Sequence, residues 1–340
     1  MHFSPRIHAN LRDVVLTLVK IPGESRSDGA DMDYKKALVT GGAGFIGSHL
    51  VRGLLARGVA VVVLDDLSMG RRENVPPDAE FVQGNVLDAD LLRQALAGVD
   101  VVFHLAARVT IRGSMERFVE DAQTNVMGTL SVLQASAHSS ARKFVLASSM
   151  AVYSDATAPV PLPETYATEP ISPYGISKLA SEKYARLICA AAGIEHVSLR
   201  FFNTYGPGQS LTPYVGVMTI FINRLLAGQP PVIFGDGEQC RDFVYVGDIV
   251  TANLLAMDAT TRGQAINVGS GHGTTVNELA AMLCRRINPQ IKPDNQPAHP
   301  GELRNSIADI SRARMILNYA PQGRLEAQLD DIISWNATRR

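Results

Sequence analysis

From Tyr34 onward, the apolar residues follow two patterns that alternate along the chain. Short continuous apolar runs, such as "VAVVVLDD" at 59–66, are typical of strands buried on both faces. Longer segments, such as "HLVRGLLARG" at 49–58, repeat their apolar residues every three or four positions, which is the period of a helix. The same patterns predict further strands at 34–40, 99–107, 142–149 and 195–203, and further helices at 88–98, 124–138 and 173–193.

This regular alternation predicts a Rossmann-type, doubly wound α/β fold, in which helices cover both faces of a parallel sheet. After Tyr205 the alternation loosens and Pro and Gly become more frequent. We therefore expect a smaller, mixed α/β domain that follows the first in the chain. The predicted division is one domain at 34–204 plus 239–266 and a second, C-terminal substrate domain at 205–238 plus 267–336.

Residues 1–33 stand apart from this pattern. The segment Leu11–Val19 has the spacing of one amphipathic turn, and a tract rich in Gly, Ser and Asp follows it. The apolar run is too short for a signal-peptide core, and no convincing small-residue cleavage site follows. We expect a mobile N-terminal extension, or a start codon placed upstream of Met32. A helix docked on the body or on a partner subunit is the alternative.

Composition and charge exclude several classes of protein. Apolar residues make up 46% of the chain and charged residues 19%, which fits a globular protein with a sizeable core. A net charge of −1 provides no basic field for nucleic acid, and no apolar run is long enough to predict a membrane span. The cysteines Cys189, Cys240 and Cys284 are far apart, so they form no metal pattern. This sparse, odd set favours a reducing compartment, and hence a cytoplasmic location.

A glycine-rich turn joins the first strand to the first helix. In "VTGGAGFIGSHL", residues Gly41, Gly42, Gly44 and Gly47 fit both G-x-G-x-x-G and G-x-x-G-x-x-G. Glycines allow a tight turn and close approach of the backbone to a pyrophosphate, and the helix N-terminus adds unpaired N–H groups. The turn therefore predicts a dinucleotide site.

Asp65 favours NAD over NADP as the dinucleotide. It ends the second strand, 18 residues after Gly47. A carboxylate there can accept hydrogen bonds from a ribose diol and would repel a 2′-phosphate. A solvated strand end is the alternative interpretation of this aspartate.

The segment "SPYGISKLASEKYA" carries candidate acid–base chemistry. Ser172 and Pro173 suit the cap and the first position of a helix, so Tyr174 and Lys178 would share one helix face. An ammonium beside the phenol should favour the phenolate and lower the tyrosine pKa, and a positive nicotinamide would act in the same direction. Ser149, at the end of the preceding strand, supports this interpretation over that of an ordinary surface helix.

These motifs together resemble the extended short-chain dehydrogenases/reductases, in particular the NAD-dependent nucleotide-sugar epimerase/dehydratase family and its UDP-glucose and UDP-N-acetylglucosamine 4-epimerases. The resemblance covers about residues 35–335. It rests on "VTGGAGFIGSHL", "VVVLDDLSMG", "GNVLD", "HLAA", "NVMGTL", "SSMAVYS", "SPYGISK", "LRFFNTYGPGQ", "FGDGEQCRDFVYVGDIV" and "INVGSG".

The resemblance implies a role for each matching residue. Ser149 hydrogen-bonds the reacting hydroxyl, Tyr174 is the acid/base, and Lys178 holds both Tyr174 and the nicotinamide ribose. The residues implied to bind NAD are Gly41, Gly44, Phe45, Ile46, Gly47, Asp65, Asn85, Val86, Leu105, Ala106, Ala107, Tyr174 and Lys178. The residues implied to bind the nucleotide sugar are Ser149, Asn203, Phe234, Arg241, His299, Glu302 and Ser306.

Several of these residues depart from the family pattern or have another interpretation. Asn85 stands where the family usually has Asp, His299 stands for a second phosphate-binding Arg, and Glu302 stands for a ribose-binding Asp. The replacement at 299 means that Arg304 compensates, that phosphate is bound more weakly, or that the nucleotide is not UDP. Asn203 could instead cap a turn and Phe234 could belong to the core.

The two residues after Ser149 discriminate between the reactions of the family. The resemblance places Asp and Glu there in 4,6-dehydratases, Glu at the second position in decarboxylases, Cys at the first in 3,5-epimerases, and hydroxyls in UDP-glucuronate 4-epimerases. Here they are Met150 and Ala151, which cannot transfer a proton. What remains is 4-epimerisation, in which tightly bound, recycled NAD takes up hydride and returns it.

Two other functions stay open. One is a net NAD-dependent reductase or dehydrogenase. The other is a non-catalytic subunit, although such a subunit should have lost Tyr174 or Lys178. We expect no bound metal ion. The family's usual homodimer joins two helices of each subunit in a four-helix interface. The apolar residues that would form it could equally face the sheet; they are Val126, Leu130, Leu133, Leu179, Tyr184 and Leu187.

Overall fold

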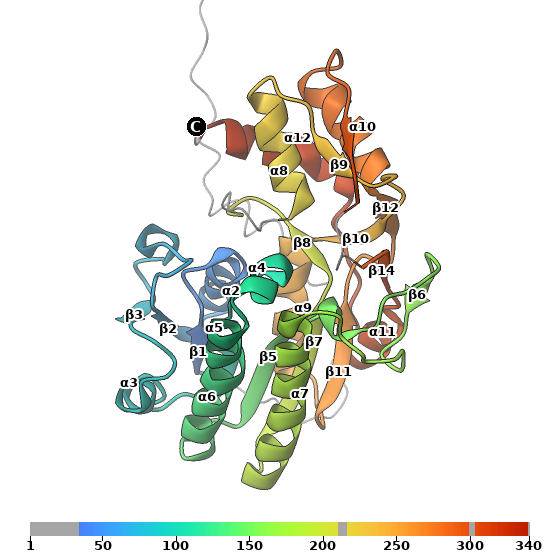
Figure 1. The fold of residues 1–340 in the computed structure, drawn as a ribbon. Helices are drawn as coiled ribbons and strands as arrows, with labels where there is room; N and C mark the ends of the chain where they lie inside the picture. Colours follow the sequence, from blue (N-terminus) through green and yellow to red (C-terminus); the bar gives the residue numbers. More distant parts are fainter. Residues whose placement is uncertain (1–33, 210–215, 299–302, 339–340) are drawn as a thin grey trace, which may run out of the picture.

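Seven parallel strands form the central sheet of the chain. The computed structural model describes residues 34–209, 216–298 and 303–338, so the extension at 1–33 lies outside the described residues. The strand order is β11-β7-β5-β4-β1-β2-β3, and every neighbouring pair is parallel (Figure 1). The strands are β1 (Lys36–Thr40), β2 (Ala60–Asp65), β3 (Glu80–Gln83), β4 (Val101–His104), β5 (Lys143–Ser149), β7 (Glu195–Phe201) and β11 (Gln264–Val268).

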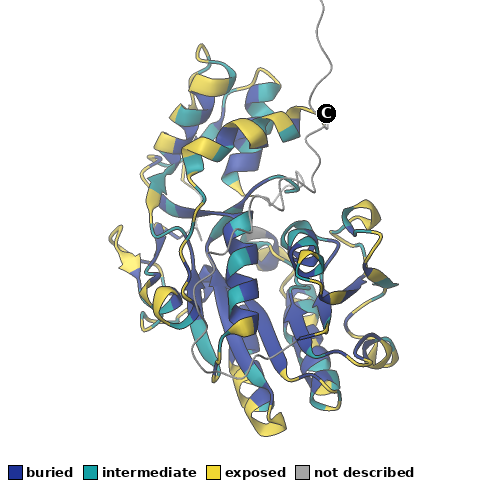
Figure 2. Ribbon diagram, turned by 180° about the vertical axis from the view of Figure 1, so that it is seen from behind, coloured by how far each residue is buried: buried dark blue, intermediate teal, exposed yellow. Residues whose placement is uncertain are grey.

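Helices cover both faces of this sheet, as the alternation predicts. On one face α2 and α9 pack together and share a core with residues such as Leu50 and Ile249. On the other face α3, α6 and α7 bury residues such as Leu92, Val132 and Ala185. Figure 2 shows the strands in the colour of buried residues and much of the exposed colour on the outer faces of the helices. The helices are α2 (Phe45–Ala56), α3 (Ala89–Ala95), α4 (Ile111–Glu116), α5 (Phe118–Ala122), α6 (Gly128–Ala137), α7 (Pro173–Ala192), α9 (Val246–Asp258) and α11 (Ser311–Leu317).

The strand order reverses between β1 and β4, and this position defines the site. In open parallel sheets, ligands bind beyond the carboxyl ends of the strands at such a switch point. The glycine-rich turn follows β1, residues 105–107 follow β4, and Ser149 ends β5. The fold therefore gathers the predicted cofactor and catalytic segments at one edge of the sheet.

A smaller group of elements forms the upper part of the molecule in Figure 1. Its main sheet has the order β12-β10-β14-β6, with β8 also paired to β10, and β13 pairs with β9. Helices α8, α10 and α12 pack around a core that includes Phe221, Leu279 and Leu329. The elements are β6 (Pro161–Leu162), β8 (Asn203–Tyr205), α8 (Val217–Leu226), β9 (Val232–Phe234), β10 (Cys240–Tyr245), β12 (Gly273–Thr275), α10 (Val276–Ile287), β13 (Asp294–Gln296), β14 (Asn305–Ala308) and α12 (Leu325–Ala337).

The segment 239–266, which the sequence assigns to the first domain, divides between the two parts. Its first strand, β10, lies in the smaller sheet, whereas α9 and β11 join the seven-stranded sheet. The strand assignment follows from pairing: Cys240 and Arg241 pair with Asn305 and Ser306 of β14.

Within the described ranges, no helix combines the length and the apolar character needed to cross a membrane. The same residues contain no group of three or more His, Cys, Asp or Glu side chains placed to hold a metal ion. The three cysteines are buried as free thiols.

Candidate active site

The glycine-rich turn is closely packed between β1 and α2. Gly41 adopts the left-handed region with φ +72°, and its N–H donates to Leu64 O at 2.8 Å. A Cβ on Gly41 would lie 2.7 Å from Ala106 N, and one on Gly47 would overlap Gly41 O. Helix α2 begins at Phe45, and its first turn, which includes Ile46, contains no acidic residue. A backbone cradle at an uncompensated helix N-terminus fits the pyrophosphate of a dinucleotide.

Asp65 lies below this turn rather than in solvent. Its carboxylate is buried and accepts hydrogen bonds from Ala43 N at 2.9 Å and Leu67 N at 2.8 Å. Burial raises the pKa of Asp65, while the two backbone N–H groups lower it. The structure thus contradicts the interpretation of Asp65 as a solvated strand end, and the remaining lone pairs of the carboxylate suit a ribose diol.

Two further segments predicted to bind NAD, at 85–86 and 105–107, follow strands next to the same turn. The Asn85 amide donates to Asp66 Oδ2 at 3.1 Å, so the residue that replaces the usual Asp is paired with a neighbouring carboxylate. Val86 is buried under α6, where a Cβ on Gly128 would approach its side chain to 2.8 Å. The segment Leu105, Ala106 and Ala107 is held to β1, because Leu105 N and Ala106 N donate to Thr40. Contacts of these residues with NAD stay predictions.

Ser149, Tyr174 and Lys178 converge where β5 ends beside the first turn of α7. The helix begins as predicted, since Ser172 Oγ accepts from Gly175 N at 3.1 Å and Pro173 occupies the first turn. Ser149 and Tyr174 are joined by a side-chain hydrogen bond. Lys178 Nζ donates to Ala147 O at 2.9 Å and lies 6.0 Å from the centroid of the Tyr174 ring. All three side chains are buried, so water is largely excluded from them.

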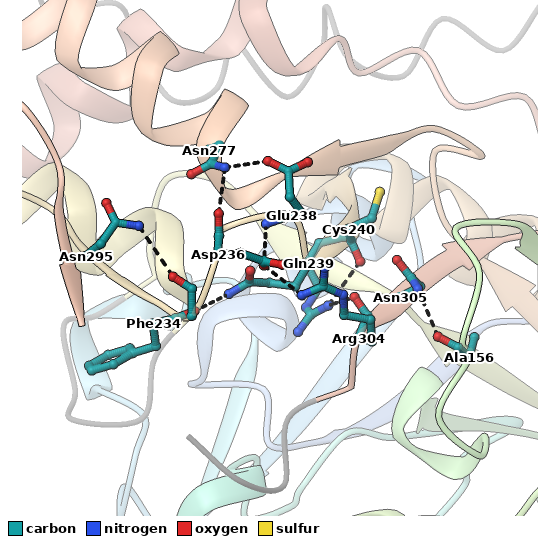
Figure 3. A network of polar contacts seen from close by, with 12 residues as sticks. Ala156, Phe234, Asp236, Glu238, Gln239, Cys240, Asn277, Asn295, Arg304 and Asn305 are labelled. Atoms are coloured by element: carbon teal, nitrogen blue, oxygen red, sulfur yellow. Dashed lines mark hydrogen bonds and ion pairs between the residues drawn. The ribbon is translucent and has the colours of Figure 1, made fainter. Parts of the chain in front are cut away.

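Three of the predicted substrate residues meet on adjoining strands. Asn203 begins β8, and its Nδ2 donates to Ser306 Oγ of β14 at 3.3 Å. Arg241 of β10 pairs directly with Ser306, and its Nη1 donates to Cys240 O at 3.0 Å. Phe234 ends β9 and is half-buried, and Figure 3 shows its ring extending away from the neighbouring polar contacts. His299 and Glu302 lie outside the described residues.

Comparisons with known proteins identify the family of this chain. The model of the "NAD dependent epimerase/dehydratase family" matches residues 37–269. The chain belongs to that family.

Among the relatives of this epimerase/dehydratase is a putative UDP-glucose 4-epimerase of Methanocaldococcus jannaschii. It is 39% identical over 300 residues, which cover 88% of this chain and 97% of the relative. The UDP-glucose 4-epimerase of Thermotoga maritima, solved with UDP-glucose, superposes with a TM-score of 0.86 at 38% identity and covers 89% of this chain and 99% of its own. The UDP-N-acetylglucosamine 4-epimerase of Methanobrevibacter ruminantium, in complex with UDP-N-acetylmuramic acid, gives a TM-score of 0.85 at 34% identity, covering 91% and 100%.

In this family member, the expectation that Lys178 lowers the Tyr174 pKa is wrong for the chain by itself. Burial raises the pKa of Tyr174 to about 12, and the hydrogen bond with Ser149 offsets this only in part. Burial also lowers the pKa of Lys178 to about 8. Desolvation disfavours the charged form of both groups, and the Asp121 carboxylate disfavours the phenolate further while it favours the charged form of Lys178. A positive charge brought beside Tyr174 would lower its pKa.

A buried ion pair behind the catalytic residues was not anticipated from the sequence. Arg200 of β7 donates from Nε and Nη2 to Glu182 of α7 at 2.9 and 2.8 Å. Glu182 also accepts from Ser148 Oγ at 2.5 Å, and Arg200 Nη1 donates to Tyr153 Oη at 2.9 Å. The network thus ties α7 to β5, which ends at Ser149, and to the neighbouring strand β7. A charged residue within the apolar run "HVSLRFF" is the signal that could have revealed it.

Asn125 is a second residue that the sequence interpretation did not single out. It lies in a π-helical turn at Gln123–Met127, between α5 and α6, and is buried. Its Nδ2 lies within hydrogen-bonding distance of Asp121 Oδ1, Arg108 O and Ser177 Oγ. π-Turns are frequent at functional sites, but they leave no periodic trace in an apolar pattern. The contacts fix the side of α7 that carries Tyr174 and Lys178.

Proposed function

We propose that this chain is a 4-epimerase of nucleotide hexoses, acting on UDP-Glc/UDP-Gal and on UDP-GlcNAc/UDP-GalNAc. The observation that carries the proposal is the pair Met150 and Ala151 directly after Ser149. Both are buried in the short turn Met150–Val152, and the Ser149 hydroxyl accepts from Ala151 N at 3.2 Å. A Cβ on Gly175 would overlap Ala151 O, so this turn is packed firmly against the start of α7. Neither side chain can act on the ketone that Ser149 and Tyr174 help to form.

The residues of the chain account for the proton transfers of this reaction. Tyr174 removes the proton of the sugar 4-hydroxyl and later returns it, while Ser149 holds that hydroxyl by a hydrogen bond. When bound, NAD would supply the reversible hydride acceptor for C4, and the glycine-rich turn, Asp65 and Lys178 are the residues that would hold it. The apolar turn at Met150 and Ala151 lets the sugar rotate between the two transfers. Segments 205–238 and 267–336, together with Asn203 and Arg241, supply the nucleotide-sugar site in this proposal. The buried free thiols support the predicted cytoplasmic location.

The experiment that tests the function uses the purified protein without added cofactor. UDP-Glc, UDP-Gal, UDP-GlcNAc and UDP-GalNAc are incubated separately with it, and the products are identified by NMR. We expect each sugar to be converted to its C4 epimer. A stable 4-keto-6-deoxy product would identify a dehydratase instead. In a parallel incubation with added NAD(P)H, its stoichiometric consumption would identify a reductase.

Ser306 supports the acceptance of sugars with a 2-acetamido group. It is small, buried, and bonded to Asn203 in the wall of the predicted sugar site. Substitution Ser306→Tyr should lower kcat/KM for the two acetamido sugars by about 10²-fold or more, because the phenol fills the space that the acetamido group needs. Steady-state kinetics on all four sugars measure this, and retained activity on UDP-Glc and UDP-Gal shows that the variant is folded. A uniform loss on all four would contradict the proposal that the size of residue 306 decides whether a 2-acetamido group is accepted.

We also propose a homodimer formed through α6 and α7, which lie side by side (Figure 1). Leu187 is 69% exposed, Met127 53% and Tyr184 43%. Leu133, in contrast, is buried against the sheet of its own chain, so its predicted place in the interface is not available. Val126, Leu130 and Leu179 are half-buried.

The dimer proposal is tested by replacing Leu187 with Glu, which should convert the dimer to a monomer in size-exclusion chromatography with light scattering. An apolar residue buried at an interface tolerates a charge poorly, because the charge loses its water without gaining a partner. Met315→Glu is the matched control, since Met315 is 78% exposed on α11, which packs on β11 and α9. A monomeric wild-type protein would refute the interface.

A further inference from the structure

Arg304 occupies a point where three segments of the chain meet. It immediately precedes β14, and its carbonyl oxygen accepts hydrogen bonds from Cys240 N at 3.0 Å and from Arg241 Nη1 at 3.1 Å. Its N–H donates to Asp155 Oδ1 at 2.6 Å, in the loop that follows the catalytic strand. The backbone of Arg304 is therefore fixed both to the predicted phosphate-binding strand and to the loop after Ser149.

Arg304 lies next to the predicted substrate residues of β10 and β14. It occupies the bend directly before β14, whose Ser306 pairs with Arg241 and is hydrogen-bonded to Asn203. The Arg241 guanidinium itself donates to the Arg304 carbonyl oxygen. Arg304 thus brings a second guanidinium to the end of the strand that pairs with Arg241.

The guanidinium of Arg304 is occupied by an exposed carboxylate. Nη1 and Nη2 donate to the two oxygens of Asp236 at 2.7 and 2.8 Å (Figure 3). The side chains are 45% and 55% exposed. Ion pairs so open to solvent are weak, because water screens both charges. A ligand with a higher negative charge can therefore replace Asp236 at little cost.

We propose that Arg304 is a ligand of the substrate's diphosphate and exchanges Asp236 for it when the nucleotide sugar binds. The inference rests on the proposed function and goes further by assigning the second cation of the site. Asp236 is two residues from Phe234, the predicted neighbour of the base, and Arg304 is two residues from Ser306, the predicted neighbour of the sugar. The diphosphate joins base to sugar, so it lies between these two ends. A planar guanidinium matches its oxygens through paired donors.

The alternative role for the same pair is purely structural: it would tie the loop after β9 to β14 whether or not a ligand is bound. The two roles predict different effects of removing the Asp236 charge on ligand binding. If Arg304 binds phosphate, removing the Asp236 charge frees the guanidinium and leaves phosphate binding unchanged or tighter. If the pair is only a tie, removing either partner loosens the same loop and weakens binding in the same direction.

The test measures binding to the full-length protein as purified with its NAD, by isothermal titration calorimetry, with UDP and with uridine as the probes. For Arg304→Gln we expect UDP binding to weaken by about 10- to 100-fold and uridine binding to stay unchanged. Arg304→Lys should lose less, and Asp236→Asn should bind UDP as well as the wild type or better. Arg285→Gln, an exposed arginine on α10, is the matched control for the loss of one charge.

The inference is overturned if Arg304→Gln behaves like Arg285→Gln, or if Arg304→Gln and Asp236→Asn weaken UDP and uridine alike. The measurement needs no turnover, so it is independent of the proposed reaction. A wild-type protein that binds UDP but forms no epimer would reject the epimerase proposal while leaving the assignment of Arg304 testable in full. Failure of the wild type to bind UDP, dTDP or GDP would overturn both.

Discussion

Replacement of Tyr174 by phenylalanine should lower kcat for epimerisation by about 10²- to 10⁴-fold, the usual contribution of a general acid–base group. The phenol is the group placed to exchange a proton with the sugar hydroxyl, and it lies buried beside Ser149, where water is a poor substitute. Since phenylalanine keeps the ring, NAD content and UDP affinity should stay near those of the wild type. The loss should therefore appear in kcat and in single-turnover reduction of the cofactor, measured at 340 nm.

A matched control for this variant is Tyr184→Phe, on the same helix. Tyr184 is 43% exposed and lies outside the catalytic cluster, so its hydroxyl should have no effect on kcat. If Tyr174→Phe retained more than about a tenth of the wild-type kcat, another group would have to supply the proton.

Replacement of Glu182 by alanine should lower the free energy of unfolding by about 3–5 kcal/mol, because it leaves the Arg200 guanidinium buried without its counter-ion. Arg200 and Glu182 are both buried and joined by two hydrogen bonds, and Ser148 would lose its acceptor as well. Urea unfolding followed by circular dichroism measures the change. The double variant Glu182→Leu, Arg200→Met should recover part of the loss, since the buried charge is then absent.

An exposed glutamate provides the comparison for this prediction. Glu73 pairs with Arg71 at 3.5 Å, with both side chains more than half exposed, so Glu73→Ala should change stability by less than about 1 kcal/mol. Equal effects of Glu182→Ala and Glu73→Ala would show that the buried network contributes no more than a surface pair.

The parts of the molecule that the sequence predicts are those with local signals. The start of α7 is an example, because its signals lie within a few residues of one another. They are the cap Ser172, the proline after it and the four-residue spacing of Tyr174 and Lys178, and the structure confirms the predicted start of the helix. The parallel sheet follows from continuous apolar runs. Strand β10 carries Arg241 and Asp242 before a short apolar run, and nothing in its residues says which sheet supplies its neighbours, because pairing with β12 and β14 joins segments distant in sequence.

Burial explains the remaining differences. The pKa of Tyr174 depends on how completely the folded chain removes the phenol from water, and spacing to Lys178 carries no information on that. The pair Arg200 and Glu182 likewise forms only when α7 lies over β7. Leu133 fits an interface by type, yet the rotation of α6 turns it toward the sheet.

The route of the chain between its two sheets has a consequence for turnover. The backbone leaves the seven-stranded sheet after β5 for β6, returns through α7 to β7, leaves again for β8 to β10, returns for α9 and β11, leaves for β12 and α10, and comes back through β14 to α11. These repeated crossings restrain separation of the two sheets more than a single connection would. We therefore expect product exchange to proceed through small loop movements, which leave a half-reacted sugar no wide opening through which to diffuse away.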